Sequence, residues 1–264
     1  MSALISVNEL KNRKNAVIID CRYSLQEPLL GRQHYKQKHI KGALYVDLMT
    51  DLSSPVGVHG GRHPLPTAEA FSALCQRLGI VQGVTEVVVY DDQRFAFASR
   101  AWWLLRYFGH DKVKVLDGGF AAWQRDGGDC DDQVVEVERG RFNAVAQRGY
   151  TATRQELLVA SEPAKRILID AREAPRYRGE VEPIDPIAGH IPTALNYPWQ
   201  DMTSQEGLFD SQQPGLASLQ GDIVVYCGSG VTACVDILAL TELGKKARLY
   251  PGSWSDWCSY YSKE

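Results

Sequence analysis

One short loop of this 264-residue chain combines a cysteine with backbone features that would activate it. The loop reads Cys227-Gly-Ser-Gly-Val-Thr232 and follows a run of apolar β-forming residues. Its glycines, Gly228 and Gly230, permit positive φ angles, so successive backbone N–H groups can turn inward as an anion-binding nest. A helix beginning just beyond Thr232 would add partial positive charge at the same place. Both effects favour a thiolate, and we therefore expect Cys227 to be a sulfur nucleophile.

The other five cysteines lack such surroundings and are expected to pack in the core; they are Cys21, Cys75, Cys130, Cys234 and Cys258. Cys234 is close enough to Cys227 in the sequence that a resolving role stays open. No CxxC pair or Cys/His spacing typical of a zinc site occurs, and disulfide frameworks belong to short secreted chains. We expect six reduced thiols and neither a metal nor an organic cofactor.

The loop also argues against phosphate chemistry. Cysteine phosphatases use a similar nest but carry an arginine, which clamps phosphate with two hydrogen bonds, where this chain has Ala233. The loop has no basic side chain, and besides the thiol its functional groups are the hydroxyls of Ser229 and Thr232. It therefore suits a nucleophile that carries sulfur better than one that carries phosphate.

An internal repeat indicates how the loop is positioned. Four pieces of the first half recur in the same order in the second half: residues 17–22 as 167–172, 39–43 as 190–194, 87–91 as 223–227, and Gly118 with Trp123 as Gly252 with Trp257. We predict two homologous domains, 1–128 and 149–264. Residues 129–148 form a linker, with a strand at Val134–Val137.

Each half alternates short Val/Ile-rich runs with helical patterns. The runs Val17–Asp20, Glu86–Tyr90, Arg166–Asp170 and Asp222–Tyr226 are typical of buried parallel strands. Helices are predicted at Ala68–Leu78, Ala96–Phe108 and Val231–Leu243; Gly109 and Gly244 follow the last two. The order predicts an α/β fold, in which each domain has a parallel-sheet core flanked by helices. Ligands bind beyond the carboxyl ends of such strands, where Asp91 and Cys227 stand.

Composition narrows the class of protein. The chain is 44% hydrophobic and 23% charged, with a net charge of −3, which is ordinary for a folded protein and excludes a broadly basic nucleic-acid binder. No apolar stretch reaches the length of a membrane span, and the first residues lack the pattern of a signal peptide. We therefore expect a cytoplasmic enzyme with a small-molecule substrate and neither a nucleic-acid nor a membrane partner.

Several motifs together resemble the tandem-domain rhodanese family of sulfurtransferases over essentially the whole chain. They are Ile169-Asp-Ala-Arg172, Gly189-His-Ile-Pro192, the loop that starts at Cys227, and Gly252–Trp257. The resemblance implies an inactive first domain and a catalytic second one. Asp91 stands where the second half has Cys227, and a carboxylate cannot carry a persulfide.

Within the family, this loop resembles the branch that takes sulfur from 3-mercaptopyruvate. The thiosulfate branch typically has Cys-Arg-Lys-Gly-Val-Thr, with cations suited to a dianion. The resemblance implies a Ser-His-Asp arrangement that assists transfer, which maps onto Ser229, His63 and Asp47. His59 is the rival for the place of His63.

The same branch binds the substrate carboxylate with two arginines. One maps onto Arg176, while the place of the second is taken here by Ile184, and Arg178 is the nearest candidate to replace it.

The loop residues Gly228, Gly230, Val231 and Thr232 are expected to surround the transferred sulfur. The repeated Asp20, Arg22 and His39, with Asp170, Arg172 and His190, occur in both halves and are expected to be structural.

These residues predict a ping-pong sulfurtransferase. Cys227 takes sulfur from mercaptopyruvate, with thiosulfate as the alternative donor, and passes it as a persulfide to cyanide, a small thiol or thioredoxin. The alternatives are a thiosulfate:cyanide sulfurtransferase on the same scaffold, a cysteine phosphatase or arsenate reductase, and a persulfide carrier or redox module without turnover. The sequence leaves the oligomeric state open.

Overall fold

The structure, a computed structural model, describes residues 2–159, 166–210 and 212–261. It divides into two compact units: unit 1 comprises residues 1–54, 66–147 and 205–209, and unit 2 comprises 55–65, 148–204 and 210–264. The predicted boundaries, 1–128 and 149–264, therefore capture most of each unit. They miss that the expected linker belongs largely to unit 1, and that residues 55–65 belong to unit 2 although they lie in the first half of the sequence.

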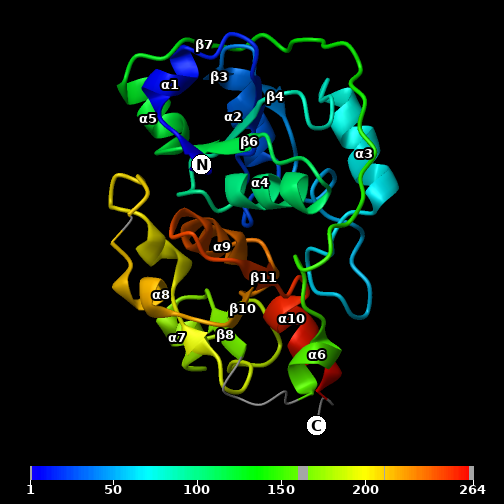
Figure 1. Cartoon of the computed structure of the whole chain (residues 1–264), viewed down its shortest axis with the longest axis vertical. Helices are drawn as coiled ribbons and strands as arrows, with labels where there is room; N and C mark the ends of the chain where they lie inside the picture. The colour runs from blue at the N-terminus through cyan, green and yellow to red at the C-terminus, as the bar shows by residue number, and fades with distance from the viewer. Residues whose placement is uncertain (1, 160–165, 211, 262–264) are drawn as a thin grey trace. The chain divides into compact units, whose positions relative to one another are not determined.

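Unit 1 is built on a parallel five-stranded sheet with the order β1-β6-β5-β2-β4. Figure 1 labels β4 and β6 of this sheet and the helices α1 to α5 of the same unit. The strands are β1 (Leu4–Ile5), β2 (Val17–Asp20), β4 (Leu44–Tyr45), β5 (Val87–Tyr90) and β6 (Val113–Leu116). Its helices are α1 (Val7–Lys11), α2 (Leu30–Gln37), α3 (Ala68–Arg77), α4 (Ala98–Tyr107) and α5 (Gly119–Arg125). A small antiparallel pair joins β3 (His39–Ile40) to β7 (Cys130–Asp131).

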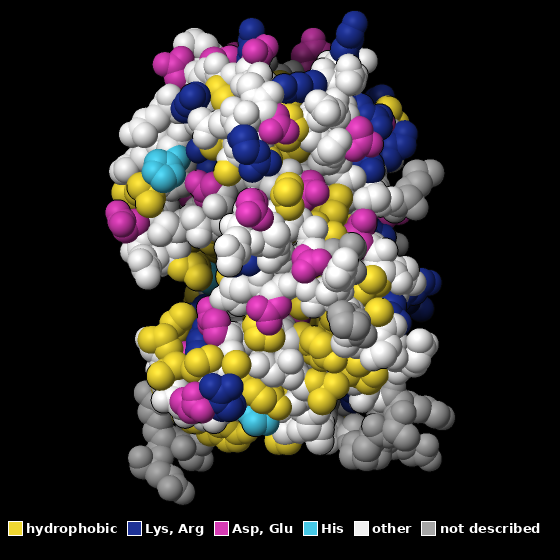
Figure 2. All heavy atoms as spheres, turned by 90° about the vertical axis from the view of Figure 1, so that its left-hand side faces the viewer, with side chains coloured by type: hydrophobic (Ala, Val, Ile, Leu, Met, Phe, Trp, Pro, Cys, Tyr) yellow, Lys and Arg dark blue, Asp and Glu magenta, His cyan; other side chains and the backbone are white. Residues whose placement is uncertain are grey.

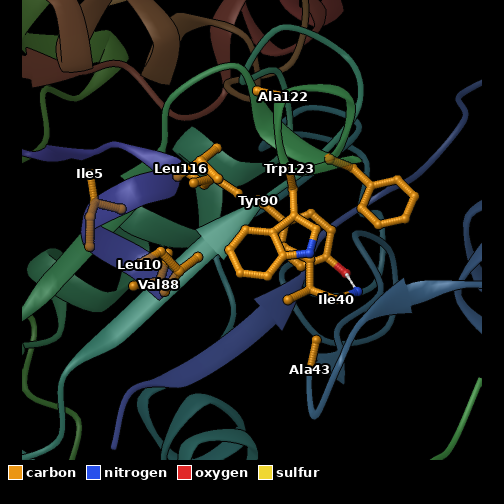
Figure 3. Close-up of a cluster of buried hydrophobic side chains, with 11 residues drawn as sticks. Ile5, Leu10, Ile40, Ala43, Val88, Tyr90, Leu116, Ala122 and Trp123 are labelled. Atoms are coloured by element: carbon orange, nitrogen blue, oxygen red, sulfur yellow. Dashed lines mark hydrogen bonds between the residues drawn. The ribbon is translucent and has the colours of Figure 1, made fainter. Parts of the chain in front are cut away.

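The core of unit 1 shows why this sheet forms. Val87 to Tyr90 are all buried, as expected for a central strand covered on both faces. Figure 3 shows Trp123 of α5 beside Tyr90 and Ile40, with the Ile40 N–H donating to the Tyr90 hydroxyl at 3.2 Å. The tyrosine thus fills the core while its polar end has a hydrogen-bond partner, which removes the cost of burying it unpaired.

Unit 2 repeats the arrangement with a parallel four-stranded sheet in the order β11-β10-β8-β9. The strands are β8 (Arg166–Asp170), β9 (Leu195–Asn196), β10 (Asp222–Tyr226) and β11 (Ala247–Leu249). Its helices are α6 (Arg154–Leu158), α7 (Ala174–Tyr177), α8 (Pro214–Ser218), α9 (Ala233–Glu242) and α10 (Ser253–Trp257), with 3₁₀ turns η1 (Trp199–Met202) and η2 (Cys258–Tyr260). Helix α9 packs on β10 and β11, so the loop that joins β10 to α9 is held at both ends.

The repeated polar residues are structural in both units, as predicted. In unit 1, Arg22 binds the Asp20 carboxylate and donates to the Lys38 carbonyl at 2.7 Å. In unit 2, Arg172 binds Asp170 and donates to the Gly189 carbonyl at 2.6 Å. Each buried ion pair therefore has additional hydrogen bonds, which a buried charge requires, and it ties a strand end to the following loop.

The predicted histidines behave in the same way. His39 Nδ1 lies 2.6 Å from the Tyr35 carbonyl, and His190 Nδ1 lies 2.8 Å from the Tyr177 carbonyl. Each imidazole also stacks on the ring of that tyrosine. Both histidines therefore hold local structure.

Most predicted elements are confirmed. Strands β2, β8 and β10 have the predicted bounds, and helices α3, α4 and α9 lie inside the predicted ranges. Gly109 and Gly244 follow the helix caps with φ of 87° and 72°, the conformation that glycine adopts most easily. The predicted strand at Val134–Val137 is wrong, because this segment has no regular structure and the linker instead pairs with β3 through Cys130–Asp131.

The surface agrees with the small net charge. Figure 2 shows acidic and basic side chains interspersed on the face drawn there. None of the helices in the described ranges has the length and apolar character that crossing a membrane requires.

Candidate active site

Cys227 is the first residue after β10 and is held rigidly from both sides of its peptide unit. Its N–H donates to the Ser253 hydroxyl at 3.1 Å, and its carbonyl accepts from the Trp254 N–H at 3.0 Å. The residue is 2% exposed. The start of α10 therefore fixes the position of the thiol against the end of the sheet.

The glycine turn directs a backbone amide at the sulfur. Gly230 has φ of +76°, and its N–H lies 3.2 Å from Cys227 Sγ. A Cβ atom at this residue would lie 2.3 Å from the Pro251 carbonyl oxygen, so the close approach of two backbone segments requires glycine. One backbone N–H of the loop thus donates to the Cys227 sulfur, as the prediction of an amide nest requires.

Ser253 supports this turn and was not foreseen from the sequence. It is fully buried and has φ of 56°, an uncommon conformation for a residue with a Cβ. Its hydroxyl accepts from the Cys227 N–H and donates to the Tyr250 carbonyl at 3.0 Å. The internal repeat could have indicated this conformation, because the residue of unit 1 that corresponds to Ser253 is a glycine, Gly119, and it has the same φ of 56°.

Ser229 and His63 are brought together as predicted. His63 Nδ1 lies 2.8 Å from Ser229 Oγ, and both side chains are buried. The rival, His59, instead lies 2.8 Å from the Ser259 hydroxyl and stacks on the Tyr260 ring. The pair is possible because residues 55–65 belong to the same unit as the loop.

Asp47 belongs to unit 1, where its carboxylate caps a turn. Its Oδ1 accepts from the N–H groups of Met49 and Thr50 at 2.9 and 3.2 Å. Its part in a Ser-His-Asp arrangement stays a prediction.

Two arginines of unit 2 reach the loop at Gly228. A Cβ atom at Gly228 would lie 3.0 Å from Arg62 Nη2 and 3.4 and 3.5 Å from Nη2 and Nη1 of Arg176. Arg176 was predicted, and Arg62 was not. Arg178, the candidate for a second guanidinium, lies on the surface, where its side chain pairs with Glu180.

Two buried carboxylates, Glu182 and Asp185, form ion pairs with these arginines. Glu182 accepts from Arg176 at 2.6 Å and from Arg172 at 3.1 Å, and Asp185 accepts from Arg62 and, at 3.4 Å, from Arg176. Burial alone would raise the pKa of Glu182, but the hydrogen bonds from Arg176 and from backbone N–H groups leave this pKa lowered. Burial raises the pKa of Asp185, against the opposing charge of Arg62.

The remaining loop residues complete the start of α9. Val231 is buried and its carbonyl accepts from the Cys234 N–H at 3.1 Å, while Thr232 is the residue before the helix. The Cys234 thiol lies 3.6 Å from the Gly230 carbonyl and is fully buried, as expected for a packing residue.

The other thiols have surroundings that disfavour the thiolate. Burial raises the pKa of Cys21, Cys75 and Cys130, and that of Cys258 to about 11. In the described ranges, His, Cys, Asp and Glu side chains form no group of three that is suited to a metal ion.

Comparison with known proteins gives a consistent result. The rhodanese-like domain family matches residues 5–126 and 153–260. This chain belongs to the rhodanese-like family. A Pseudomonas aeruginosa protein named as a 3-mercaptopyruvate sulfurtransferase is 42% identical over 253 residues, covering 91% of this chain and 88% of that protein.

Two further relatives support the class. SseB of Mycobacterium tuberculosis, which carries the name of a thiosulfate sulfurtransferase, is 40% identical and covers 92% of this chain and 87% of that protein. The structure of 3-mercaptopyruvate sulfurtransferase from Leishmania major matches with a TM-score of 0.86 at 30% identity, over 98% of this chain and 75% of that one. The chain is a sulfurtransferase with two rhodanese domains, whereas the names of its relatives differ in the donor.

Proposed function

We propose that the chain transfers sulfur from 3-mercaptopyruvate to a thiophilic acceptor through a persulfide on Cys227. The observation that carries this proposal is the junction of β10 and α9, where the thiol meets the Gly230 N–H, with Ser229 paired to His63 beside it. A loop without basic side chains but flanked by two guanidiniums suits a donor with one carboxylate.

The first half-reaction moves sulfur onto the enzyme. The Cys227 thiolate attacks the sulfur of mercaptopyruvate, so that an S–S bond forms while the C–S bond breaks. The electron pair of the C–S bond goes to carbon as the enolate of pyruvate. The proton of the donor thiol ends on that carbon, which leaves pyruvate and a persulfide anion on Cys227. The Gly230 amide stabilises the negative charge on sulfur.

Ser229 and His63 manage the proton in this step. The Ser229 hydroxyl is 2.8 Å from His63 Nδ1, a distance at which a proton can pass between them. We include Asp47 in the proposal as the group that orients His63. In this role the three side chains accept the proton of the donor thiol and deliver it to the enolate.

The second half-reaction regenerates the thiolate. An acceptor nucleophile such as cyanide, a small thiol or reduced thioredoxin attacks the outer sulfur, the S–S bond breaks, and its electron pair returns to Cys227. All six cysteines are free thiols, which fits a reducing compartment such as the cytoplasm.

The donor assay tests the proposal directly. Wild type is expected to show a higher kcat/KM with mercaptopyruvate than with thiosulfate, with cyanide as acceptor. Cys227→Ser should abolish transfer, whereas Cys234→Ser, the matched control in the same segment, should retain it. Mass spectrometry after donor alone should show an addition of about 32 Da, one sulfur atom, that is absent in Cys227→Ser.

Three results would contradict the proposal. Transfer that survives Cys227→Ser would move the nucleophile elsewhere. A higher kcat/KM for thiosulfate would assign the chain to the other donor. A stable sulfur adduct without turnover would indicate a persulfide carrier.

A second experiment tests the proton relay. Ser229→Ala and His63→Gln should each lower kcat with mercaptopyruvate by about 10²-fold, the usual size of general acid–base assistance. His59→Gln is the control, since His59 contacts Ser259 and should leave kcat unchanged. With thiosulfate, which brings no thiol proton, the loss should be smaller; an equal loss with both donors would indicate a structural role instead.

A further inference from the structure

The arginines at Gly228 are only partly used by their acidic neighbours. Arg62 donates to Asp185 through Nη1, and Arg176 donates to Glu182 and Asp185 through Nε and Nη2. Arg62 Nη2 and Arg176 Nη1 have no hydrogen-bond partner within the described part of the chain. Both nitrogens lie within 3.5 Å of the Cβ position of Gly228. Two unused donors therefore converge on the loop that carries Cys227.

The acids differ from the arginines in exposure. The side chains of Glu182 and Asp185 are 2% and 3% exposed, whereas those of Arg176 and Arg62 are 13% and 30% exposed. The carboxylates are thus more deeply buried than the guanidiniums that they bind. Because the acids are buried, solvent screens their charges little.

The charges of this cluster cancel. Three guanidiniums and three carboxylates are linked through the pairs Arg172–Asp170, Arg172–Glu182, Arg176–Glu182, Arg176–Asp185 and Arg62–Asp185. The site thus offers well-directed N–H donors without an excess of positive charge.

We infer that Asp185 is a specificity-determining residue that makes this donor site prefer an anion of one charge to a dianion. The inference deepens the proposed function and rests on it. Coulomb energy scales with the product of the charges, so the buried Asp185 carboxylate penalises thiosulfate twice as much as the single carboxylate of mercaptopyruvate. Arg62, held by Asp185, acts as the second guanidinium that Ile184 does not supply.

The test is Asp185→Asn, which removes the charge but keeps an oxygen that accepts from Arg62. The ratio of kcat/KM for thiosulfate to that for mercaptopyruvate should rise about tenfold, because the dianion gains more than the monoanion. Glu180→Gln is the matched control, since it removes one acid from the same segment, at an exposed pair with Arg178. The control ratio should stay unchanged.

An unchanged or lower ratio in Asp185→Asn would overturn the inference, as would an equal rise in Glu180→Gln. If Asp185→Asn does not fold, wild type still answers the question. At constant ionic strength, propionate should inhibit mercaptopyruvate turnover at lower concentration than sulfate, and the reverse order would overturn the inference.

These outcomes are separable from those of the proposed function. If wild type transfers sulfur from neither donor, the proposed function fails. If mercaptopyruvate is turned over through Cys227 but the ratio and the order of inhibition oppose the expectation, the role of Asp185 alone fails.

Discussion

The loops at Asp91 and Cys227 occupy the same position in the two units and hold different side chains, a carboxyl group and a thiol. Each follows a strand that ends in a buried tyrosine. The carbonyl of each residue accepts an N–H from the helix that follows the next strand, that of Phe120 in α5 or Trp254 in α10. In unit 1 the Asp91 carboxylate accepts four backbone N–H groups, from Gln93, Phe95, Phe97 and Ala98, at 2.8 to 3.1 Å. In unit 2 the Cys227 sulfur accepts the N–H of Gly230.

The comparison shows what the nest is shaped to hold. An aspartate side chain reaches two bonds beyond Cβ to its oxygens, and a cysteine persulfide reaches two bonds beyond Cβ to its outer sulfur. Asp91 therefore fills its nest as the persulfide anion would fill that of Cys227. Unit 1 thus has an amide nest around an anion, with a carboxylate in place of a sulfur that could be transferred.

The backbone of the two turns differs as well. Unit 2 uses Gly230 at φ of +76°, whereas unit 1 places Arg94 and Phe95 at φ of 56° and 72°. Residues with a Cβ are costly in this region, so unit 1 tolerates strain around a carboxylate that several amides hold in place.

The substitution Cys227→Asp, which gives the loop of unit 2 the same residue as Asp91 in unit 1, is expected to have the largest effect on activity. The new carboxylate should occupy the nest as Asp91 does, so that sulfur transfer falls more than 10⁴-fold while the unfolding midpoint is retained or raised. The measurements are kcat/KM with mercaptopyruvate and urea unfolding.

Cys227→Ser separates the two parts of this expectation. It should be equally inactive and no more stable than Cys227→Asp, because a hydroxyl is shorter than a carboxylate and carries no charge. If Cys227→Asp is much less stable than Cys227→Ser, the two nests are not equivalent.

The strands that carry these loops were predictable from the sequence, and the surroundings of the loops were not. Runs such as Ile223–Tyr226 are so apolar that only a buried strand accommodates them, and the repeat confirms their place. The two-residue strands β1, β4 and β9 offer too few residues for any period to be seen.

The missed arginine has a different cause. Arg62 stands in a Gly- and Pro-rich segment with no periodicity, and its role depends on residues 55–65 packing with unit 2. The choice between His63 and His59 depends on the same packing. Such long-range contacts leave no local pattern. Arg176 could be placed because the family resemblance maps a substrate-binding arginine four residues after the Asp170-Ala-Arg172 motif.

A smaller effect is expected from removing the anion of unit 1 with Asp91→Ala. At pH 7 the change leaves four buried N–H groups without their acceptor, and each unsatisfied group costs about 1–3 kcal/mol before water enters the space. We expect a loss of about 4 kcal/mol of unfolding free energy. Hydrogen exchange of the amides of residues 93–98 should speed up, while Cys227 should still form its persulfide. A loss below about 1 kcal/mol would mean that the four contacts contribute little.

The smallest effect is a pH dependence of stability, which comes from the Asp91 carboxyl group of unit 1. Burial raises the pKa of Asp91 to about 6, with backbone N–H donors acting in the opposite direction, from 3.8 in an unfolded chain. Between these values the folded state binds more protons than the unfolded state, so stability falls as pH rises from about 4 to about 6. The full loss for this shift is about 3 kcal/mol, and Asp91→Asn, which cannot titrate, should not show it. The difference in unfolding free energy between wild type and Asp91→Asn, measured from pH 4 to 6.5, should therefore decline. A difference that instead rises with pH would mean that the amide nest, rather than burial, sets the pKa of Asp91. The nest would then bind an anion more strongly, and unit 1 would resemble a persulfide site more closely.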